Sequence, residues 1–443
     1  MEPFRARSRL LPLLLALLVC ACTSAPPTPS PAASPSTTEQ PAPSTPLPVT
    51  PPPATPPPVT PAIPPASPTP LPPSPSPTPI LTPALPLGEL SAGPLQTALD
   101  DRRARLAVPG VAAAVIFPDG SRWGGGAGYR SLDPERPATP DTPFVTGSIS
   151  KTYVAAAVMA LVADGVLSLD DPLADWLPDY PRARRITLRM LLDHSSGVAN
   201  YFELKLYNRL VFKATEPRIW TAQEILDTFD APFHFQPGEG YRYSNTGFVL
   251  LGLVIEAASG QSLGEFYRQR FFEPLGLRDT YYQGEGPPPP DAAHGFRTRP
   301  DGVLYLFTDG TDYRPTASAA SVANAAGAIT ASANDVATWT HALYGGELLP
   351  PELLAEMTDW KPAGGVRGDY GLGTRTRLFE GYRGFGHTGS VSGFIGATWY
   401  FPELELTISV LNNRGVIDPD RETRALLRAV LPAVRDYLGI ASP

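Results

Sequence analysis

Ser148 and Lys151 are the residues whose types and spacing most directly suggest chemistry. They form a Ser-x-x-Lys pair in "TGSISKTYVAAAV", and residues three apart on a helix share one face. A serine hydroxyl is a weak nucleophile until a base removes its proton. Lysine can be that base when burial lowers its pKa, whereas arginine stays protonated. The pair predicts a nucleophile beside its base, although Ser-x-x-Lys alone also fits a capped helix start with a solvated lysine.

A second motif, "YRYSNTG", supplies Tyr243 and Asn245 in a predicted loop. A tyrosine could carry a proton during catalysis, and we expect a nearby lysine ammonium to favour its phenolate form. Asn245 could orient Lys151 and hydrogen-bond to a substrate amide. The alternative for Tyr243 is an aromatic residue that packs a turn onto the core.

A third motif, "GHTGSVSGF", supplies His387, Thr388 and Gly389 where a strand begins. We expect Gly389 to let a substrate approach the strand edge and Thr388 to hydrogen-bond to a carboxylate. The backbone N–H groups of Ser148 and Ser390 are then natural donors to an oxyanion.

The three motifs, in this order, resemble the active site of serine β-lactamases and penicillin-recognising DD-peptidases. The resemblance covers Gly88 to Leu438 and extends to "LLDHSSG" and "FFEPLGLRDTYY". Tyr-x-Asn, rather than Ser-Asp-Asn, resembles the branch of class C β-lactamases, D-alanyl-D-alanine carboxypeptidases, D-aminopeptidases and related esterases. His387 stands where class C enzymes carry lysine, as in the carboxypeptidases, which argues against efficient β-lactam hydrolysis.

The resemblance implies an acyl-enzyme on Ser148, with Tyr243, Asn245 and His387 in the catalytic site. Whether Lys151 or Tyr243 is the base stays open, because a coupled pair titrates as a unit. Arg375 in "YGLGTRTR", or less favourably Arg377, would hold a terminal substrate carboxylate. A solvated arginine at a strand edge is the alternative.

Three functions fit these motifs. The first is a serine hydrolase that resembles D-alanyl-D-alanine carboxypeptidases and acts on peptidoglycan peptides. The second keeps the chemistry but acts on small esters or β-lactams. The third, from another class, is a non-catalytic domain that binds such molecules. No cofactor or metal is expected for any of them.

The predicted fold is α/β (α+β), with strands at both ends of residues 88–443 and helices in the middle. "VAAAVIFPDGSRWGGGAGYRSL" predicts two strands around a "PDG" turn, and "FIGATWYF" and "LTISVLNN" predict two more. Residues 150–163 are apolar on nearly all sides, which is typical of a helix through a domain centre. An antiparallel sheet built from both chain ends, flanked by helices and with a mostly helical insertion, satisfies this order.

The first 87 residues predict export and tethering. Residues 1–22 place arginines before a short apolar run and end in "VCAC", which resembles the lipobox of bacterial lipoproteins, with Cys22 lipidated. An ordinary cleaved signal peptide is the alternative. Residues 23–87 hold 27 of the chain's 56 prolines and predict a disordered linker. We therefore expect an extracytoplasmic domain, lipid-anchored to a bacterial membrane and within reach of peptidoglycan.

Three other features of the sequence argue against alternative functions and sites. The formal charge of −8 argues against nucleic acid as a partner. Ser262 in "GQSLG" matches a nucleophile elbow, but helical spacing precedes it and Glu265 follows it as in a capping box. The five histidines lack metal-ligand spacing, and we interpret His194 in "LDHSSG" as structural and leave it out of the site.

Overall fold

The computed structural model describes residues 85–212, 218–229, 232–287, 289–298, 304–306, 320–360, 369–391, 393–415 and 418–441. The expected signal segment 1–22, with Cys22, and the expected linker as far as residue 84 lie outside the described residues.

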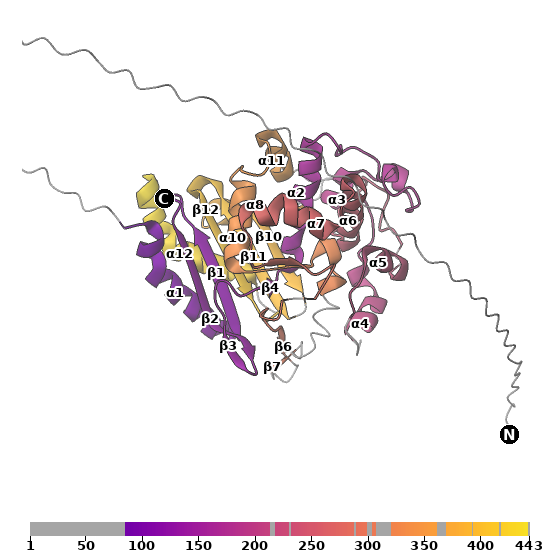
Figure 1. Ribbon diagram of the computed structural model, residues 1–443. Helices are drawn as coiled ribbons and strands as arrows, with labels where there is room; N and C mark the ends of the chain where they lie inside the picture. The colour runs from indigo at the N-terminus through magenta and orange to yellow at the C-terminus, as the bar shows by residue number, and fades with distance from the viewer. Residues whose placement is uncertain are drawn as a thin grey trace, which may run out of the picture. The chain divides into compact units, whose positions relative to one another are not determined.

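A seven-stranded antiparallel sheet organises the described part of the chain (Figure 1). Its strand order is β3-β2-β1-β12-β11-β10-β9, so the first and last long strands of the chain, β1 and β12, lie side by side at its centre. This arrangement confirms the prediction that both chain ends build one sheet. The strand bounds are β1 Gly110–Ile116, β2 Arg122–Leu132, β3 Glu135–Pro137, β9 Arg375–Phe379, β10 Tyr382–Val391, β11 Phe394–Phe401 and β12 Leu406–Asn412.

Strand β1 shows why the sheet needs cover on both faces. Ala112, Ala114 and Ile116 belong to one hydrophobic core, and the alternating residues Val111 and Val115 belong to a second core on the other face. Successive side chains of a strand point to opposite faces, so a strand that is apolar throughout must be buried on both sides. Helices meet that requirement.

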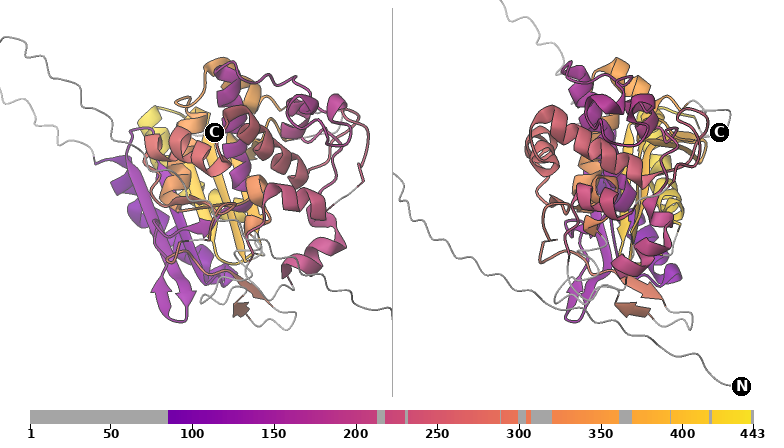
Figure 2. Two further views of the ribbon diagram at one scale, coloured as in Figure 1. Left: turned by 45° about the vertical axis from the view of Figure 1, so that its right-hand side comes forward. Right: turned by 90° about the vertical axis from the view of Figure 1, so that its right-hand side faces the viewer.

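Two helices, one from each end of the chain, cover one face of the sheet, while the helices from the middle of the chain gather on the other (Figures 1 and 2). The first face carries α1 Leu87–Leu106 and α12 Pro419–Leu438, which pack together. The helices from the middle of the chain are α2 Ser150–Ala163, α3 Leu188–Leu192, α4 Lys205–Phe212, α5 Ala222–Thr228, α6 Asn245–Ser259, α7 Leu263–Tyr267, α8 Glu273–Leu275, α10 Ala333–Tyr344 and α11 Pro351–Thr358.

Helix α2 runs through the middle of the larger core, as its sequence predicts. All its residues from Ser150 to Leu161 are buried, and it packs against α6, which is apolar around most of its surface. A helix with no polar face is stable only when neighbours enclose it. The start of α2 is therefore held rigidly, and that start carries the Ser-x-x-Lys pair.

Helix α1 begins at Leu87, whereas the sequence "GPLQTALDDRRARLAVPG" by itself predicts an amphipathic helix only from Gly93 onward. Side chains from the distant turn between β1 and β2 cap its first N–H groups: Leu87 N donates to Asp119 Oδ2 and Gly88 N to Ser121 Oγ, both at 2.8 Å. The first N–H groups of a helix have no partner within the helix, so such capping stabilises its start. Local sequence patterns cannot show a cap supplied from more than 30 residues away.

Two small sheets complete the described elements. One has the order β4-β8-β5, and the other pairs β6 with β7. The bounds are β4 Phe144–Val145, β5 Thr280–Tyr282, β6 Phe296–Thr298, β7 Leu304–Leu306 and β8 Ile329–Ala331. Strand β4 leads directly into the turn that carries Ser148, so its pairing with β8 helps to fix that turn.

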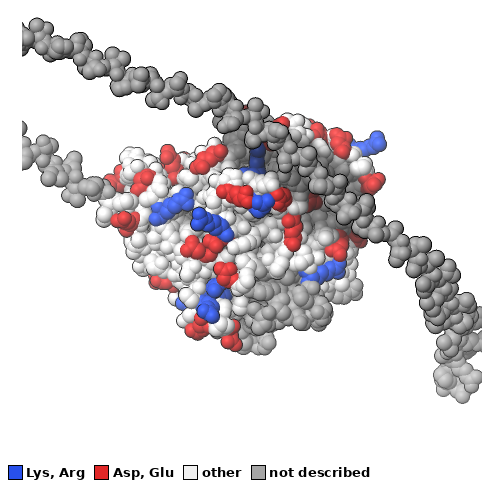
Figure 3. Space-filling model, viewed as in Figure 1, with Lys and Arg blue, Asp and Glu red and all other residues white. Residues whose placement is uncertain are grey.

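Acidic and basic side chains are interspersed on the face of the domain in Figure 3. Within the described ranges, no single helix is both long and apolar enough to cross a membrane; the bent pair formed by Asn245–Ser259 and Leu263–Leu275 passes on length and composition only. Nor do these ranges contain a group of three or more His, Cys, Asp or Glu side chains placed to hold a metal ion.

Candidate active site

Ser148 lies in a single 3₁₀ turn, Gly147–Ile149, directly before α2. The turn packs closely against β10. A Cβ atom on Gly389 would lie 1.7 Å from the Thr146 carbonyl oxygen, and one on Gly147 would lie 2.8 Å from Ser390 N. Gly389 therefore lets β10 approach the nucleophile turn, a role different from the substrate approach that we expected. The close packing brings the Ser390 end of β10 beside the turn of Ser148.

Lys151 is fully buried one helical turn after Ser148. Its Nζ lies 2.7 Å from Asn245 Oδ1, 2.7 Å from the Ala326 carbonyl oxygen and 3.2 Å from Ser148 Oγ. Burial, together with the positive charge of Arg375, holds the pKa of Lys151 well below its usual value. The amine is therefore neutral over a wider pH range than that of an exposed lysine.

The three contacts of Nζ fit a neutral amine, as they also fit an ammonium with three N–H donors. A neutral amine has two N–H donors and one lone pair, and the oxygens of Asn245 and Ala326 can only accept hydrogen bonds. With both donors used there, the lone pair remains for the hydroxyl proton of Ser148. The pair that we predicted from the sequence is thus in hydrogen-bond contact, with Lys151 in a geometry suited to a base.

Tyr243 precedes α6 and reaches Ser148 from the other side. Its side chain lies near that of Ser148, and its ring centroid lies 4.9 Å from Lys151 Nζ. Burial raises the pKa of Tyr243 above its usual value, more than Ser148 and the Arg375 charge lower it. Our expectation that a nearby lysine ammonium would favour a phenolate is wrong here, because burial of the phenol outweighs the neighbouring charges. Tyr243 is a phenol in the free site and therefore a proton donor.

Asn245 is the first residue of α6, and Ser244 caps that helix by accepting a hydrogen bond from Gly247 N. The helix start therefore fixes the spacing of Tyr243 and Asn245. Asn245 Nδ2 donates to Asn200 Oδ1 at 3.1 Å, which orients the amide so that its oxygen faces Lys151. Sequence reasoning missed Asn200, which lies 45 residues away in the chain.

His387 is buried, and both its ring nitrogens are engaged. Nδ1 contacts the Thr388 carbonyl oxygen, which can only accept, so the proton lies on Nδ1. Nε2 then accepts a hydrogen bond from the Tyr370 hydroxyl at 3.0 Å. Burial and the charge of Arg375 lower the pKa of His387, which favours the neutral ring. His387 therefore lies beside the site, and its two ring nitrogens are hydrogen-bonded to Tyr370 and Thr388.

The edge of β10 beyond Gly386 is open on one side. Strand β9 pairs with β10 only from Tyr382 to Gly386, and no other described strand pairs with that edge. Thr388 is partly exposed and Ser390 is exposed along this stretch. An unpaired strand edge presents N–H and C=O groups to an extended ligand. This edge is where we expect Thr388 and Ser390 to meet a substrate.

The two arginines that we considered as ligands of a substrate carboxylate have different surroundings in the structure. The guanidinium carbon of Arg375 lies 5.7 Å from the ring centroid of Tyr243 and 5.4 Å from that of Tyr370, so its charge stands at the site. Arg377 instead forms an ion pair with Asp420 at 3.0 Å. The two residues lie on the same face of β9, two positions apart, so the ion pair with Asp420 is what distinguishes Arg377.

Sequence reasoning also missed Tyr370 and set His194 aside, yet both contact the site. The ring of His194 lies 4.3 Å from that of Tyr243 and 4.6 Å from that of Tyr370, centroid to centroid. Both residues come from loops, where no periodic pattern indicates which side chain points inward. Ser262, by contrast, follows helix α6 and caps α7 by accepting from Glu265 N, as we predicted.

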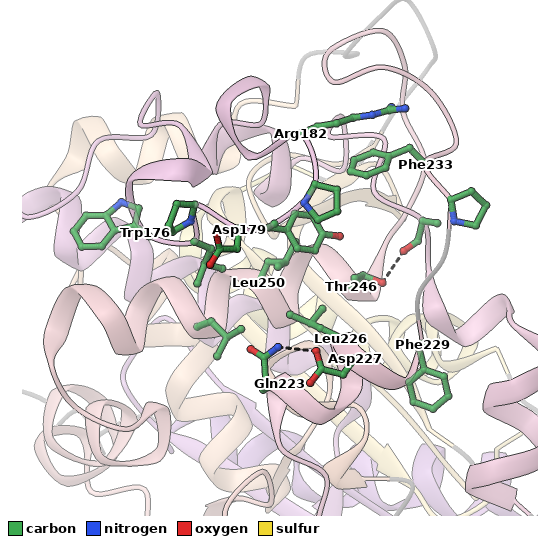
Figure 4. A pocket seen from close by; sticks show the side chains of 17 residues that line it. Trp176, Asp179, Arg182, Gln223, Leu226, Asp227, Phe229, Phe233, Thr246 and Leu250 are labelled. Carbon is green, nitrogen blue, oxygen red and sulfur yellow. Dashed lines mark hydrogen bonds between the residues drawn. The ribbon is translucent and has the colours of Figure 1, made fainter.

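A separate cavity of about 970 Å³ lies behind the N-terminal half of α6 (Figure 4). Thr246 and Leu250 form its α6 wall, and Ser148, Lys151 and Tyr243 do not line it. Its other walls are mostly aromatic, aliphatic and proline side chains, with Asp179, Arg182 and Asp227 at the rim (Figure 4). The aromatic and aliphatic lining residues include Trp176, Leu177, Tyr180, Leu226, Phe229, Phe233 and Leu253.

Comparison with known proteins agrees with this geometry. The family model described as Beta-lactamase matches residues 95–432, which include every described residue of the site discussed above. The chain belongs to the beta-lactamase family. Among solved structures, this family member is similar to the D-amino acid amidase from Ochrobactrum anthropi, with a TM-score of 0.67, 29% identity, and coverage of 77% of this chain and 98% of the amidase.

Two curated relatives of this beta-lactamase-family chain are similar over shorter stretches. Penicillin-binding protein 4* from Bacillus subtilis is 34% identical over 34% of this chain, and esterase EstB from Burkholderia gladioli is 36% identical over 36% of it. The matches span 33% and 43% of the lengths of these two relatives. The predicted family and fold are confirmed, and the relatives include a penicillin-binding protein, an esterase and an amidase, as in a superfamily of serine hydrolases.

Proposed function

We propose that this chain is a serine hydrolase that forms an acyl-enzyme on Ser148 and cleaves peptides ending in a free carboxylate, in the manner of a D-alanyl-D-alanine carboxypeptidase. The observation that carries the proposal is the bonding of Lys151. A buried amine with two carbonyl acceptors and one serine hydroxyl within reach is arranged to receive a proton.

The proton path follows from the site. Ser148 transfers its proton to Lys151 as it attacks the substrate carbonyl, and the backbone N–H groups of Ser148 and Ser390 face the developing oxyanion. Tyr243, held as a phenol, donates a proton to the leaving amine. Lys151, now an ammonium 4.9 Å from the Tyr243 ring, restores that proton. Water then replaces the leaving amine and reverses the sequence to release the acid.

The charge at the site favours a substrate carboxylate. Arg375 is a permanent cation next to Tyr243 and Tyr370, and its Nε atom has no hydrogen-bond partner within the described ranges. A carboxylate can accept two parallel N–H bonds from a guanidinium. An aminopeptidase must instead hold a substrate ammonium, which Arg375 would repel. The similar penicillin-binding protein and D-amino acid amidase support a D-configured peptide as substrate.

The first test of the proposed function measures acylation and turnover together. The purified chain is incubated with a fluorescent penicillin and, separately, with an N-acylated peptide that ends in D-Ala-D-Ala. We expect a covalent adduct and release of D-alanine, both lost in Ser148→Ala. Turnover of p-nitrophenyl esters or nitrocefin without release of D-alanine would instead support hydrolysis of small esters or β-lactams. The similarity to esterase EstB favours that alternative. Wild-type activity that survives in Ser148→Ala would remove Ser148 from the mechanism.

Arg375 has its own test. Arg375→Gln should raise KM by about 10- to 100-fold for the peptide with a free terminal carboxylate, because a hydrogen-bonded charge pair is lost. The same peptide with an amidated terminus is the reference substrate, since any effect of Arg375 on the pKa of Lys151 acts on both. Arg377→Gln is the matched control, because Arg377 bonds to Asp420. An equal change for both substrates would contradict a carboxylate-binding role.

We further propose that Cys22 is lipidated and that the chain is tethered to a bacterial membrane through the segment that follows. The arginines before a short apolar run and the "VCAC" sequence support this proposal. Expression with a labelled fatty acid should give a labelled chain in the membrane fraction. Cys22→Ala should lose the label. A labelled Cys22→Ala chain, or an unlabelled wild-type chain in the soluble fraction, would contradict it.

A further inference from the structure

His194 has an unusual backbone conformation. Its φ is +65°, in the left-handed region that is uncommon for residues other than glycine, although Asn, Asp and His adopt it more often than the rest, and the residue is only 1% exposed. Such a conformation costs free energy and persists only where surrounding contacts hold it. The contacts of His194 therefore indicate what the conformation serves.

The contacts bracket Tyr243. The carbonyl oxygen of His194 accepts a hydrogen bond from Arg242 N at 3.1 Å, and its ring Nδ1 accepts one from Ser244 N at 3.2 Å. One residue thus holds the backbone immediately before and immediately after Tyr243. Its ring also packs on the Tyr243 ring, with 4.3 Å between centroids, and on Tyr370 and Phe248.

The hydrogen bond from Ser244 defines the state of the ring. A backbone N–H can only donate, so Nδ1 is an acceptor and the ring proton lies on Nε2. Nε2 is buried and has no hydrogen-bond partner among the residues that the structure describes. Burial and the charge of Arg375 keep the pKa of His194 low, which preserves the acceptor. The ring makes no hydrogen bond to Ser148 or Lys151, so it is not itself a proton carrier.

We propose that His194 is a positioning residue that clamps the backbone on both sides of Tyr243 and thereby aims the phenol at Ser148. The expected effect on kcat rests on the proposed function, whereas the two hydrogen bonds that hold the backbone around Tyr243 do not depend on it. It replaces the purely structural role that the sequence suggested for His194.

Two substitutions separate the clamp from general packing. Asparagine and glycine both adopt a positive φ readily, so neither His194→Asn nor His194→Gly adds backbone strain. The Oδ1 atom of asparagine stands at the same distance along the side chain as Nδ1 and accepts a hydrogen bond, whereas glycine offers no acceptor. Both lose the imidazole ring. The difference between them therefore reports the Ser244 bond.

The kinetic test uses the full chain with the D-Ala-D-Ala peptide. We expect His194→Gly to lower kcat by about 10- to 100-fold with little change in KM, since small misplacements of a catalytic group have effects of that size. His194→Asn should recover most of kcat. The control is His341→Leu, which removes a half-buried imidazole whose ring is bonded to Thr407 of β12, and it should leave kcat unchanged. Equal kcat values for the asparagine and glycine variants, with equal thermal stability, would overturn the proposal.

A second measurement keeps the inference separate from the proposed function. Amide hydrogen exchange at Ser244 should accelerate at least about tenfold in His194→Gly but not in His194→Asn, whether or not a substrate is known. Unchanged exchange in His194→Gly would overturn the clamp. Accelerated exchange together with wild-type kcat would overturn the positioning role. A wild-type chain without any activity that depends on Ser148 would refute the proposed function. The hydrogen-exchange rates at Ser244 alone would then decide whether His194 holds the backbone around Tyr243.

Discussion

Lys151 is buried with three oxygen atoms as hydrogen-bond partners, and burial lowers its pKa. When the amine is neutral, the two carbonyl oxygens accept its N–H groups and its lone pair faces Ser148. The chain has four lysines among 35 basic residues, so the preference for arginine elsewhere does not extend to this position. Because arginine keeps its proton, an arginine at this position could not be the base in the proposed mechanism.

We predict that Lys151→Arg lowers the rate of acylation by at least about 100-fold, the lower end of what a general base contributes. The longer guanidinium would also enter a fully buried space, so thermal stability must be measured in parallel. Lys205→Arg, on the exposed surface of α4, is the matched control and should acylate normally. Stopped-flow acylation with a fluorescent penicillin measures both. A Lys151→Arg variant that folds and acylates at the wild-type rate would show that Lys151 is not the base.

The residues around Ser148 differ in how far apart in the sequence the interacting partners lie. Ser148 and Lys151 are separated by three positions, and Tyr243 and Asn245 by two, so short motifs are enough to predict them. Other contacts join loops to distant segments: His194 bonds to Ser244 across 50 positions, and Asn200 to Asn245 across 45. Nothing in the local pattern of a loop indicates such a contact.

Strand β10 and the nucleophile turn depend on each other at the scale of elements. We predict that Gly389→Ala both destabilises the domain and slows acylation, because its Cβ would lie 1.7 Å from the Thr146 carbonyl oxygen and push the turn away. Gly93→Ala is the control: Gly93 lies in α1, where an added Cβ meets nothing within 4 Å and favours the helix. Thermal unfolding and acylation rates would be compared. An unaffected Gly389→Ala would mean that the turn can move without loss.

Helix α12 brings a buried carboxyl to the back of the sheet. Glu422 is 1% exposed and lies near Asn412 of β12 and Arg102 of α1. Burial raises its pKa from 4.5 to about 8, an effect larger than the opposing influence of Arg102. The folded state therefore keeps a proton that the unfolded state loses above pH 4.5. Stability from this proton is complete below pH 4.5 and is lost as the pH rises towards 8.

We predict that Glu422→Gln, which cannot ionise, becomes progressively more stable than the wild type between pH 5 and pH 8. The difference in the unfolding constant should grow by up to about tenfold per pH unit. Urea unfolding at three pH values in this window measures it, with the exposed Glu352→Gln on α11 as control. A difference that shrinks as the pH rises would reverse the sign of this prediction and refute the buried neutral carboxyl.

Long elements were predictable from the sequence where burial imposes a period. The alternating core membership of β1 and the all-apolar surface of α2 leave one plausible structure each, and both formed as expected. Shorter strands such as β5 and β8 have three residues each, too few to show a period. The start of α1 was missed because Asp119 and Ser121 supply its cap through the folded structure.

The whole molecule depends on both ends of its chain. Helices α1 and α12 together cover one face of the sheet, where α12 buries Leu427, Leu431 and Val434. We predict that ending the chain at residue 418, which removes α12, prevents folding by exposing that face. Circular dichroism and penicillin labelling of the truncated chain test this. A chain ending after residue 441 is the control. A folded and active truncated chain would show that α1 alone covers the face.

Ser148 rests against a strand that is made about 240 residues after it. During synthesis the ribosome completes Ser148, Lys151 and Tyr243 long before it adds Ser390 and the central strand β12. Until then Ser148 has no strand packed beside it, and there is no strand edge to which a peptide could bind. The proposed site is therefore complete only after β12, within the last tenth of the chain, has been synthesised.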